Sequence, residues 1–412
     1  MKKYNILIVH AHWNNRGDEA AIRAMVDSLK EKLPIEKIRI MIMSEEINYF
    51  PYEEIELIPD FPSKRMYYID AFLNVITFGR FSLTKRGRAF LKAVKESDLV
   101  IHAHGGPSIG DLYGGRSFDL LYLYRLFVIE ICNKKPLFFY APSIGPFNGK
   151  IKNLIRKLIL KKAKLIVIRE QISADYLKEQ MGLNCYVTFD SVLQNKIPEN
   201  YVNKYKGQRE FSKIWDMVNK ERVVGVTITD LRWHSKYVSN VELQEMIINS
   251  LVKVSQYLVK KDYRILLIPQ IFNKDYEKIE KDLLCKIQKI NDEKIYILPL
   301  NIDSFGIQMV VSRLFSVIGM RSHSVLFAVK GRTPFISIPY EHKMEGFLNE
   351  LELRELMIRV EEISSEKIID KFEYIENNYN SIKNRLEIKV PMLMEKSKKT
   401  TDLILESIKN LE

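Results

Sequence analysis

Cysteine is scarce in this sequence, whose 412 residues include only Cys132, Cys185 and Cys285. Because the three are scattered and odd in number, they indicate neither a disulfide framework nor a CxxC metal site. This usage is typical of reduced thiols in a cytoplasmic protein. No apolar run is long enough to span a bilayer. We interpret the apolar start, "YNILIVHAH", as a first strand rather than as a signal peptide.

Several sequence signatures of cofactor and metal sites are also absent. The stretch "HGGPSIGD" does not match GxGxxG and has no Walker lysine, which excludes a Rossmann dinucleotide site and a P-loop there. Two HxH pairs, His10 with His12 and His102 with His104, could each place two rings on one face of a strand. Without an HExxH motif or a cysteine cluster, we expect no metal and instead a polar role toward an acceptor.

The overall composition is that of a folded globular protein, with 46% hydrophobic and 28% charged residues. The chain is long enough for two domains of ordinary size. Its formal net charge is +12, which favours a nucleic acid, an anionic membrane face or an anionic small substrate as partner. Charge alone does not choose among them.

Short apolar runs alternate with amphipathic stretches along most of the chain. "YNILIVHAH", "DEAAIRAMVDSLKEKL" and "KIRIMIMS" predict a β-α-β opening, with Asp18 able to cap the helix. Such openings are typical of α/β folds with parallel sheets. A polar stretch near residues 192–222 interrupts the rhythm before a second series of strands. We therefore predict domains at 1–195 and 220–363, and a helical tail at 364–412.

Polar residues collect just beyond the predicted strands, where ligands bind in open parallel sheets. The stretches concerned are "NNRGDEA", "HGGPSIGD", "APSIGPF", "IRE", "FDS", "TDLRW", "GMRSH" and "PYEHK". Each alone is explained by a turn or a helix cap. As a series in both predicted domains, they indicate two sheets that face one cleft.

The stretch "GMRSHSVLF" places two cationic residues where a strand passes into a helix. "SVIG" predicts the strand end and "SHSVLFAVK" the helix, which Gly331 could end in a left-handed conformation. Arg321 and His323 then lie at the helix N-terminus, where a cation is disfavoured unless an anion is bound. With the free N–H groups they would cradle a phosphate or carboxylate. Lys343 and Arg169 could reach the same place, although each alone could be a surface ion pair.

These motifs, above all "GMRSHSVLFAVKGRTPFISIPYEHK", resemble the polysaccharide pyruvyl transferase family from about residue 5 to about residue 346. The resemblance implies a GT-B-like α/β fold, in which two Rossmann-like domains with mostly parallel sheets face a cleft. It implies phosphoenolpyruvate as donor, with no cofactor and no metal. The donor residues would be Arg321, His323 and Lys343 of the C-terminal domain, with Arg169 reaching the donor from the N-terminal domain. The acceptor residues would be Asn15, Asp18, His104, Gly105, Gly106, Asp111, Ser143 and Asp230.

The family reaction suits these residues. Two arginines and a lysine would neutralise the carboxylate and phosphate of the donor. His323 would act as general acid toward the enol carbon, and Asp18 or Asp111 would take the proton of the attacking sugar hydroxyl. A second hydroxyl would then close a cyclic ketal as phosphate leaves. The acceptor would be a sugar of a bacterial polysaccharide, such as a capsule or exopolysaccharide, or of a lipid-linked oligosaccharide.

Two other functions remain open from the sequence. A nucleotide-sugar glycosyltransferase on the same fold would bind its diphosphate at the same helix N-terminus. A polyanion-binding protein would suit the charge, but the lysines are spread along helices and the aromatics lie within strands, so we expect no nucleic acid partner. The basic amphipathic helix at 150–164 would be a solvated helix, or would lean on the inner face of the cell membrane.

Overall fold

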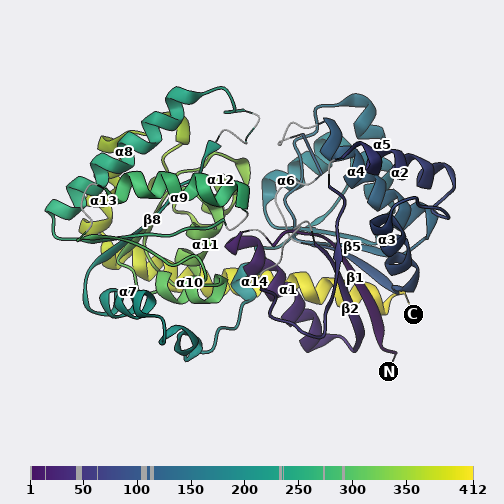
Figure 1. Cartoon of the computed structure of the whole chain (residues 1–412), viewed down its shortest axis with the longest axis horizontal. Helices are drawn as coiled ribbons and strands as arrows, with labels where there is room; N and C mark the ends of the chain where they lie inside the picture. Colours follow the sequence, from purple (N-terminus) through teal and green to yellow (C-terminus); the bar gives the residue numbers. More distant parts are fainter. Residues whose placement is uncertain are drawn as a thin grey trace. The chain divides into compact units, whose positions relative to one another are not determined.

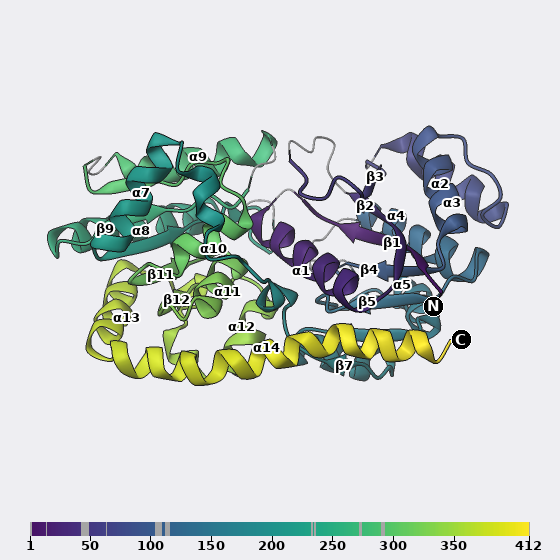
Figure 2. The same ribbon diagram turned by 90° about the horizontal axis from the view of Figure 1, so that it is seen from below.

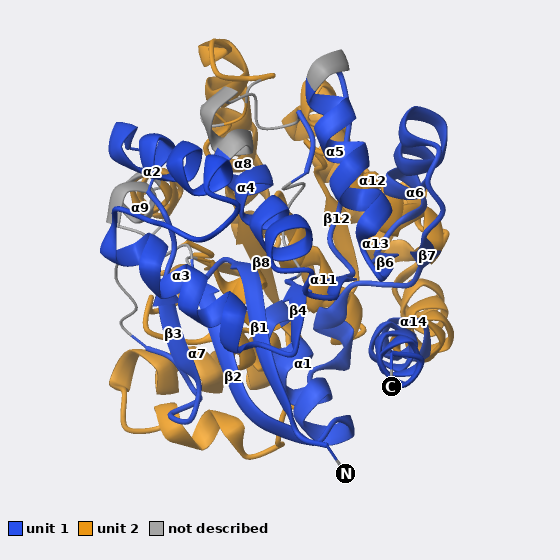
Figure 3. Cartoon of the chain, turned by 90° about the vertical axis from the view of Figure 1, so that its right-hand side faces the viewer, with its two compact units in different colours: residues 1–13, 21–195, 395–412 blue, residues 14–20, 196–394 orange. Residues whose placement is uncertain are grey.

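The computed structural model describes residues 2–13, 15–42, 49–62, 64–103, 109–111, 116–231, 234, 236–271, 274–289 and 293–411. The chain divides into two compact units, coloured blue and orange in Figure 3. Unit 1 comprises residues 1–13, 21–195 and 395–412, and unit 2 comprises residues 14–20 and 196–394. The segment that opens the first predicted helix therefore belongs to unit 2, and the predicted tail is shared between the units.

Unit 1 is built on a seven-stranded sheet in the order β3-β2-β1-β4-β5-β6-β7, with every neighbouring pair parallel. Its strands are β1 (Tyr4–Ala11), β2 (Ile35–Ile42), β3 (Glu56–Pro59), β4 (Leu99–His102), β5 (Leu137–Tyr140), β6 (Leu165–Ile168) and β7 (Tyr186–Val187). The central strands are buried on both faces, as their unbroken apolar runs predict. The sequence did not reveal the edge strand β3, which is short, partly exposed and ends at a proline.

Helices cover both faces of this sheet. They are α1 (Arg16–Lys32), α2 (Arg65–Ile76), α3 (Lys85–Glu96), α4 (Arg116–Phe127), α5 (Lys150–Lys162) and α6 (Gln171–Tyr176), with π-helical turns η1 (Val128–Cys132) and η2 (Leu177–Met181). On one face, Leu7 and Val9 of β1 join a core with Phe90 of α3, Leu126 of α4 and Leu160 of α5. This layered core fixes where the strands end, and hence where the predicted polar residues lie.

Unit 2 is built on a five-stranded parallel sheet in the order β10-β9-β8-β11-β12. Its strands are β8 (Val223–Thr227), β9 (Arg264–Leu267), β10 (Ile295–Ile297), β11 (Ser316–Gly319) and β12 (Phe335–Ser337). Its helices, several labelled in Figure 1, are α7 (Arg209–Lys220), α8 (Val241–Lys260), α9 (Lys274–Gln288), α10 (Ser304–Val311), α11 (Ser322–Lys330), α12 (His342–Leu351) and α13 (Ser365–Asn377). Short 3₁₀ turns are η3 (Ser191–Gln194, in unit 1), η4 (Tyr201–Tyr205), η6 (Arg354–Leu356) and η7 (Val360–Glu362).

The last helix, α14 (Tyr379–Lys409), is the long yellow helix of Figure 2. The division between the units falls within it, before Glu395. Its final part packs on the sheet of unit 1, where Thr401 Oγ1 lies 2.6 Å from the hydroxyl of Tyr140. Ser397 also accepts a hydrogen bond from Gln194, at 2.8 Å through its carbonyl. The end of the chain is thus an integral part of unit 1.

Two local expectations from the sequence were wrong. Helix α1 begins at Arg16, and its cap is Asn15 rather than Asp18, because Asn15 Oδ1 accepts the Asp18 N–H at 2.7 Å. Gly331 has φ −75° and is not left-handed. A side chain there would instead collide with Ser312, whose Cα would lie 2.8 Å from an added Cβ. Among the described helices, none combines the length and the apolar character that crossing a bilayer requires.

Candidate functional site

The predicted anion site lies where the strand order of unit 2 reverses. Beyond β8 the chain adds strands on one side, and from β11 onward it adds them on the other. Ligands of open α/β sheets bind beyond the carboxyl ends of the strands at such a switch point. Arg321 and helix α11 follow β11 directly, so the topology places them where a ligand is expected.

The turn between β11 and α11 is held in place by hydrogen bonds to Thr227 at the end of β8. Arg321 is the N-cap residue, with extended backbone and no capping hydrogen bond from its own side chain. Ser324 Oγ donates to the Arg321 carbonyl at 2.6 Å and lies 2.8 Å from the Thr227 hydroxyl. That hydroxyl also accepts the Met320 N–H at 3.2 Å. A guanidinium has donors only, so the Arg321 side chain cannot cap the helix and instead adds positive charge beside its free N–H groups.

His323, in the first turn of α11, packs directly on the first turn of α1. A Cβ added at Gly17 would lie 2.0 Å from His323 Nδ1 and 2.1 Å from its Cγ. Rotation of the ring about the Cα–Cβ bond of His323 does not relieve this clash, because the Cβ of His323 itself would lie 2.4 Å from the added Cβ. Both residues belong to unit 2. Two motifs that are distant in sequence, "NNRGDEA" and "GMRSH", thus form one surface.

A buried carboxylate links Arg321 to the same segment. Glu280 of α9 accepts the backbone N–H groups of Gln270 and Ile271 at 2.9 and 2.8 Å, and its other oxygen lies 3.6 Å from Arg321 Nη2. The Gln270 carbonyl in turn accepts the Arg16 N–H at 2.9 Å. Burial raises the pKa of Glu280, although the charge of Arg321 opposes that shift. Glu280 orients the guanidinium without a short charge-assisted bond, so Arg321 keeps capacity for an anion.

Lys343 lies in the first turn of α12 and pairs with Glu341 at 2.5 Å. Burial alone would raise the pKa of Glu341, but Lys343, with His234 and His342 nearby, holds it below its ordinary value. Burial lowers the pKa of His234, because it disfavours the charged imidazolium, while the negative charge of Glu341 opposes this shift. Lys343 is thus a half-buried cation, paired with a carboxylate that is ionised at neutral pH. His234 was not predicted from the sequence, where its place just beyond β8 was the one signal for it.

Asp18 is buried and held by the residue that caps its helix. Asn15 Nδ2 donates to Asp18 Oδ2 at 2.5 Å, and the backbone of Asn15 bridges to Ile271. The neighbouring Glu19 accepts from Arg16 at 2.7 Å and from the Ser304 hydroxyl at 2.9 Å. Asp18 therefore has a fixed position in the same segment as Gly17, with one carboxylate oxygen engaged by an amide.

Arg169 and Ser143, from unit 1, share one buried network at the ends of β5, β6 and β7. Arg169 Nε donates to Ser143 Oγ at 2.7 Å, and its Nη1 donates to Asp190 at 2.8 Å. Ser143 donates to Glu170 at 3.1 Å, and Ser173 bonds the other oxygen of Glu170. The structure brings a predicted donor residue and a predicted acceptor residue into contact. Arg169 already faces two carboxylates, so its free positive charge is small.

Asp111 is held by an arginine rather than presented to a ligand. Arg156 of α5 donates to both of its oxygens at 2.8 Å, and Asn148 N–H adds a third bond at 2.7 Å. The Arg156 hydrogen bonds lower the pKa of Asp111 to about 2, which makes it a weak base. Asp230 is buried in the loop after β8. His104, Gly105 and Gly106 lie outside the described residues.

Three histidines meet at the switch point of the other sheet, between β1 and β4. His10 Nε2 lies 3.3 Å from His12 Nε2, and the rings of His10 and His102 stack with centroids 5.2 Å apart. Burial lowers the pKa of His102 to about 3 and lowers that of His10 as well. At neutral pH the rings of His10 and His102 are therefore uncharged hydrogen-bonding groups. Within the described part of the chain, no group of three or more suitable side chains is placed to hold a metal ion.

The fold and sequence have known relatives. The chain is 22% identical to the amylovoran biosynthesis protein AmsJ of Erwinia amylovora, over 98% of this chain and 99% of that protein. A UDP-GlcNAc 2-epimerase from Neisseria meningitidis, solved with UDP-GlcNAc, superposes with a TM-score of 0.59 at 11% identity, covering 98% and 100% of the chains. A trehalose 6-phosphate synthase from Burkholderia multivorans superposes with a TM-score of 0.56 at 11% identity, covering 100% and 99%. These likenesses confirm the GT-B-like fold.

The family itself is given by the sequence. The model of the polysaccharide pyruvyl transferase family matches residues 15–342, which begin at the α1 cap and end at the start of α12. The match therefore includes Gly17, Arg169, Arg321 and His323. The chain belongs to the polysaccharide pyruvyl transferase family, and its role is that of a pyruvyltransferase acting on polysaccharide.

Proposed function

We propose that this protein transfers the pyruvyl group of phosphoenolpyruvate to two hydroxyls of a sugar, forming a cyclic ketal and releasing phosphate. The observation that carries the proposal is the start of α11 at the switch point of unit 2. There Arg321 places a guanidinium at the helix N-terminus, 3.6 Å from Glu280, and His323 lies in the first helical turn against Gly17. Helix N–H groups, an arginine and an imidazole are the groups that bind a phosphate or carboxylate beside a proton donor.

The proposed donor site uses Arg321 to bind one anionic group of phosphoenolpyruvate in a fork. The first-turn N–H groups of α11 add a partial positive charge. Lys343 is proposed as a further cation for the donor, held in place by Glu341. Arg169 stays a predicted donor ligand; its engagement by Asp190 and Ser143 favours an orienting role for it as much as neutralisation.

The proposed reaction needs one acid and one base. His323 in its charged form gives a proton to the methylene carbon of the enol, which leaves C2 electrophilic. A sugar hydroxyl adds to C2 and loses its proton to Asp18. The C2–O bond to phosphate then breaks, and a second hydroxyl adds to C2 to close the ketal, while the departing phosphate takes its proton. Asp18 suits the role of base better than Asp111 does, because Arg156 stabilises the charged form of Asp111.

The deciding experiment measures the fate of both the pyruvyl group and the phosphate of phosphoenolpyruvate. Phosphoenolpyruvate labelled in its pyruvyl carbons is incubated with the protein and with glycan or lipid-linked oligosaccharide acceptors. Release of phosphate that requires acceptor, together with label in the acceptor, supports the proposal. The competing substrates are UDP- and GDP-sugars, because structures with this fold include one solved with UDP-GlcNAc. Release of UDP or GDP, with no turnover of phosphoenolpyruvate, would overturn it in favour of glycosyl transfer.

A further inference from the structure

Helix α2 of unit 1 exposes an apolar side to solvent. It buries the polar side chains of Asp70 and Asn74 and exposes large apolar ones. The exposed residues are Met66 (54%), Ile69 (48%), Phe72 (64%) and Ile76 (55%). Their spacing of three or four positions puts them on one side of the helix. An ordinary surface helix does the opposite, with polar residues outward, so this helix is built to face something other than water.

The buried polar groups of α2 fix the loop that follows. The Asp70 carboxylate accepts hydrogen bonds from the Ser82 hydroxyl at 2.8 and 2.9 Å and from Leu83 N–H at 2.6 Å. Asn74 Nδ2 donates to the Phe81 carbonyl at 2.7 Å. This loop exposes three more large apolar side chains, namely Phe78 (67%), Phe81 (49%) and Leu83 (48%). Their exposure is thus held in place by a buried network and does not come from a loose segment.

The same segment is rich in exposed positive charge. The exposed basic residues between 64 and 96 are Lys64, Arg65, Arg80, Lys85, Arg88, Lys92 and Lys95. In the same span, whose residues are all described, the exposed acidic residue is Glu96, which is already bonded to Arg39 at 2.5 Å. We call the exposed apolar residues of α2 and its loop, together with these basic residues, the α2–α3 face.

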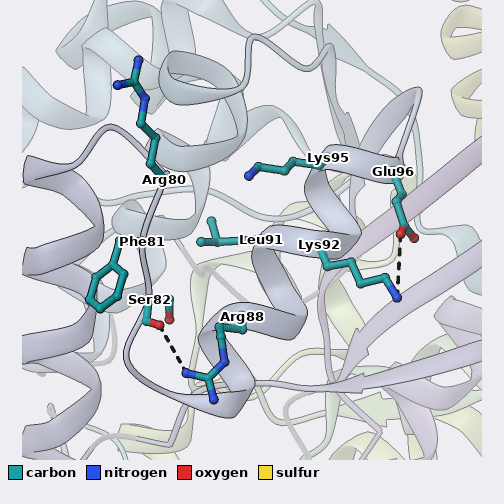
Figure 4. A pocket seen from close by; sticks show the side chains of 8 residues that line it. All are labelled: Arg80, Phe81, Ser82, Arg88, Leu91, Lys92, Lys95 and Glu96. Atoms are coloured by element: carbon teal, nitrogen blue, oxygen red, sulfur yellow. Dashed lines mark hydrogen bonds and ion pairs between the residues drawn. The ribbon is translucent and has the colours of Figure 1, made fainter.

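The α2–α3 face includes a pocket of about 460 Å³. Figure 4 shows Arg80, Arg88, Lys92 and Lys95 around it, with Lys92 paired to Glu96. Phe81 and Leu91 line the same pocket. A hollow with a basic rim and apolar walls suits the phosphate of a lipid headgroup and the start of its chain.

We propose that the α2–α3 face docks unit 1 on an anionic lipid bilayer. Aromatic and aliphatic side chains would enter the boundary between headgroups and acyl chains, while the arginines and lysines bind phosphates. A second copy of this chain fits less well, because a self-contact would place like charges opposite one another. A neutral apolar protein groove would leave the basic residues unmatched.

Helix α5 extends the proposed contact. It exposes Leu154 (71%) and Leu158 (48%) and has basic residues in its last turn. Both α2 and α5 pack against α4, and Figure 3 shows the three helices in a row along one edge of unit 1. The sequence pointed only to α5 as a membrane helix. The structure adds α2 and its loop, where the larger apolar side chains are.

Vesicle sedimentation of the full chain, without substrates, tests this proposal separately from the proposed reaction. We expect binding to vesicles of equal parts phosphatidylcholine and phosphatidylglycerol, weakening as salt is added, and little binding to phosphatidylcholine alone. Phe72→Ser with Phe78→Ser should weaken binding at least about tenfold. Arg80→Gln with Lys95→Gln should remove much of the salt dependence. Ile388→Ser with Met392→Ser, at equally exposed positions on α14, should bind as the wild type does.

Each other outcome contradicts the proposal. Failure of the wild type to bind anionic vesicles would overturn it, as would equal binding by the Phe72 and Phe78 double variant and the α14 control. Equal binding to neutral vesicles would remove the role of the basic residues. Concentration-dependent dimers that the double variant abolishes would assign the face to a second copy instead. Thermal unfolding of every variant checks that these exposed substitutions leave the fold intact.

Discussion

Gly17 touches the imidazole of His323, and no larger residue fits at position 17 without moving the ring. An added Cβ would lie 2.0 Å from Nδ1, far inside van der Waals contact. The glycine lies in the first turn of α1 and the histidine in the first turn of α11. The contact fixes one side of the ring, and with it the direction in which the proposed acid points.

Gly17→Ala should therefore slow turnover strongly while sparing the helix. Alanine is the better helix former by about 1 kcal/mol, so α1 itself does not suffer, but His323 must move. We expect acceptor-dependent phosphate release to fall by about 10²-fold, because misplacement of about 1 Å costs that much. Gly207→Ala is the matched control, since an added Cβ there meets nothing within 4 Å. Normal turnover by the Gly17 variant would refute the positioning role.

His323→Gln separates proton transfer from anion binding. If His323 is the general acid, kcat should fall by about 10²–10⁴-fold while the KM for phosphoenolpyruvate changes little. Steady-state kinetics, with calorimetric binding of phosphoenolpyruvate to the variant, provide the two readouts. Loss of donor binding with unchanged kcat would instead make His323 an anion ligand only.

The sequence predicted the elements around this site well because they are the most buried. "SHSVLFAVK" matches α11 residue for residue, since a strand, a polar turn and an apolar helix follow one another without ambiguity. The family motifs also indicated Arg321 and His323. What the motifs could not give is that Gly17 and His323 touch, because this requires the fold of unit 2.

Other features were hidden because they depend on tertiary contacts. Glu280 comes from a helix rich in charged residues, and only its burial beside Arg321 distinguishes it. Asp111 looked like a candidate base until the structure paired it with Arg156. The exposed apolar side of α2 is equally invisible to the sequence, since an apolar face is normally the inner one. Such contacts are determined by packing, not by local pattern.

Asp111→Asn should affect stability and leave catalysis nearly unchanged. Arg156 is fully buried, so loss of the carboxylate leaves a buried cation poorly paired, at a cost of about 2–4 kcal/mol. The pKa of Asp111 is lowered to about 2, first by the Arg156 hydrogen bonds. The wild type therefore gains this stability above about pH 4 and loses it as the pH falls toward 2.

The matched substitution Asp18→Asn discriminates between the two carboxylates. Thermal unfolding and kcat are measured for both variants at neutral pH. The Asp18 variant should lose about 10²-fold or more in kcat if Asp18 is the base, and the Asp111 variant should keep kcat within about threefold. The reverse pattern would transfer the role of base to Asp111.

Glu130, in the turn η1 that extends α4, should make the protein less stable as the pH rises. Burial raises the pKa of Glu130 to about 8, and neither oxygen has a hydrogen-bond partner among the described residues. Between about pH 4.5 and 8 the folded state keeps a proton that the unfolded state has released. The contribution of protonated Glu130 to the free energy of unfolding is therefore full below this range. It falls by a few kcal/mol, on the order of 1 kcal/mol per pH unit, as the pH reaches 8.

Glu130→Gln removes that loss, because the amide is neutral at every pH in the range. We expect the Tm of the variant to match the wild type near pH 5 and to exceed it by several degrees at pH 8. Glu199→Gln, at an exposed turn position, is the control and should show no such trend. If the Tm difference between variant and wild type were the same at both pH values, the prediction would be wrong. Glu130 would then be charged at pH 5 as well as at pH 8.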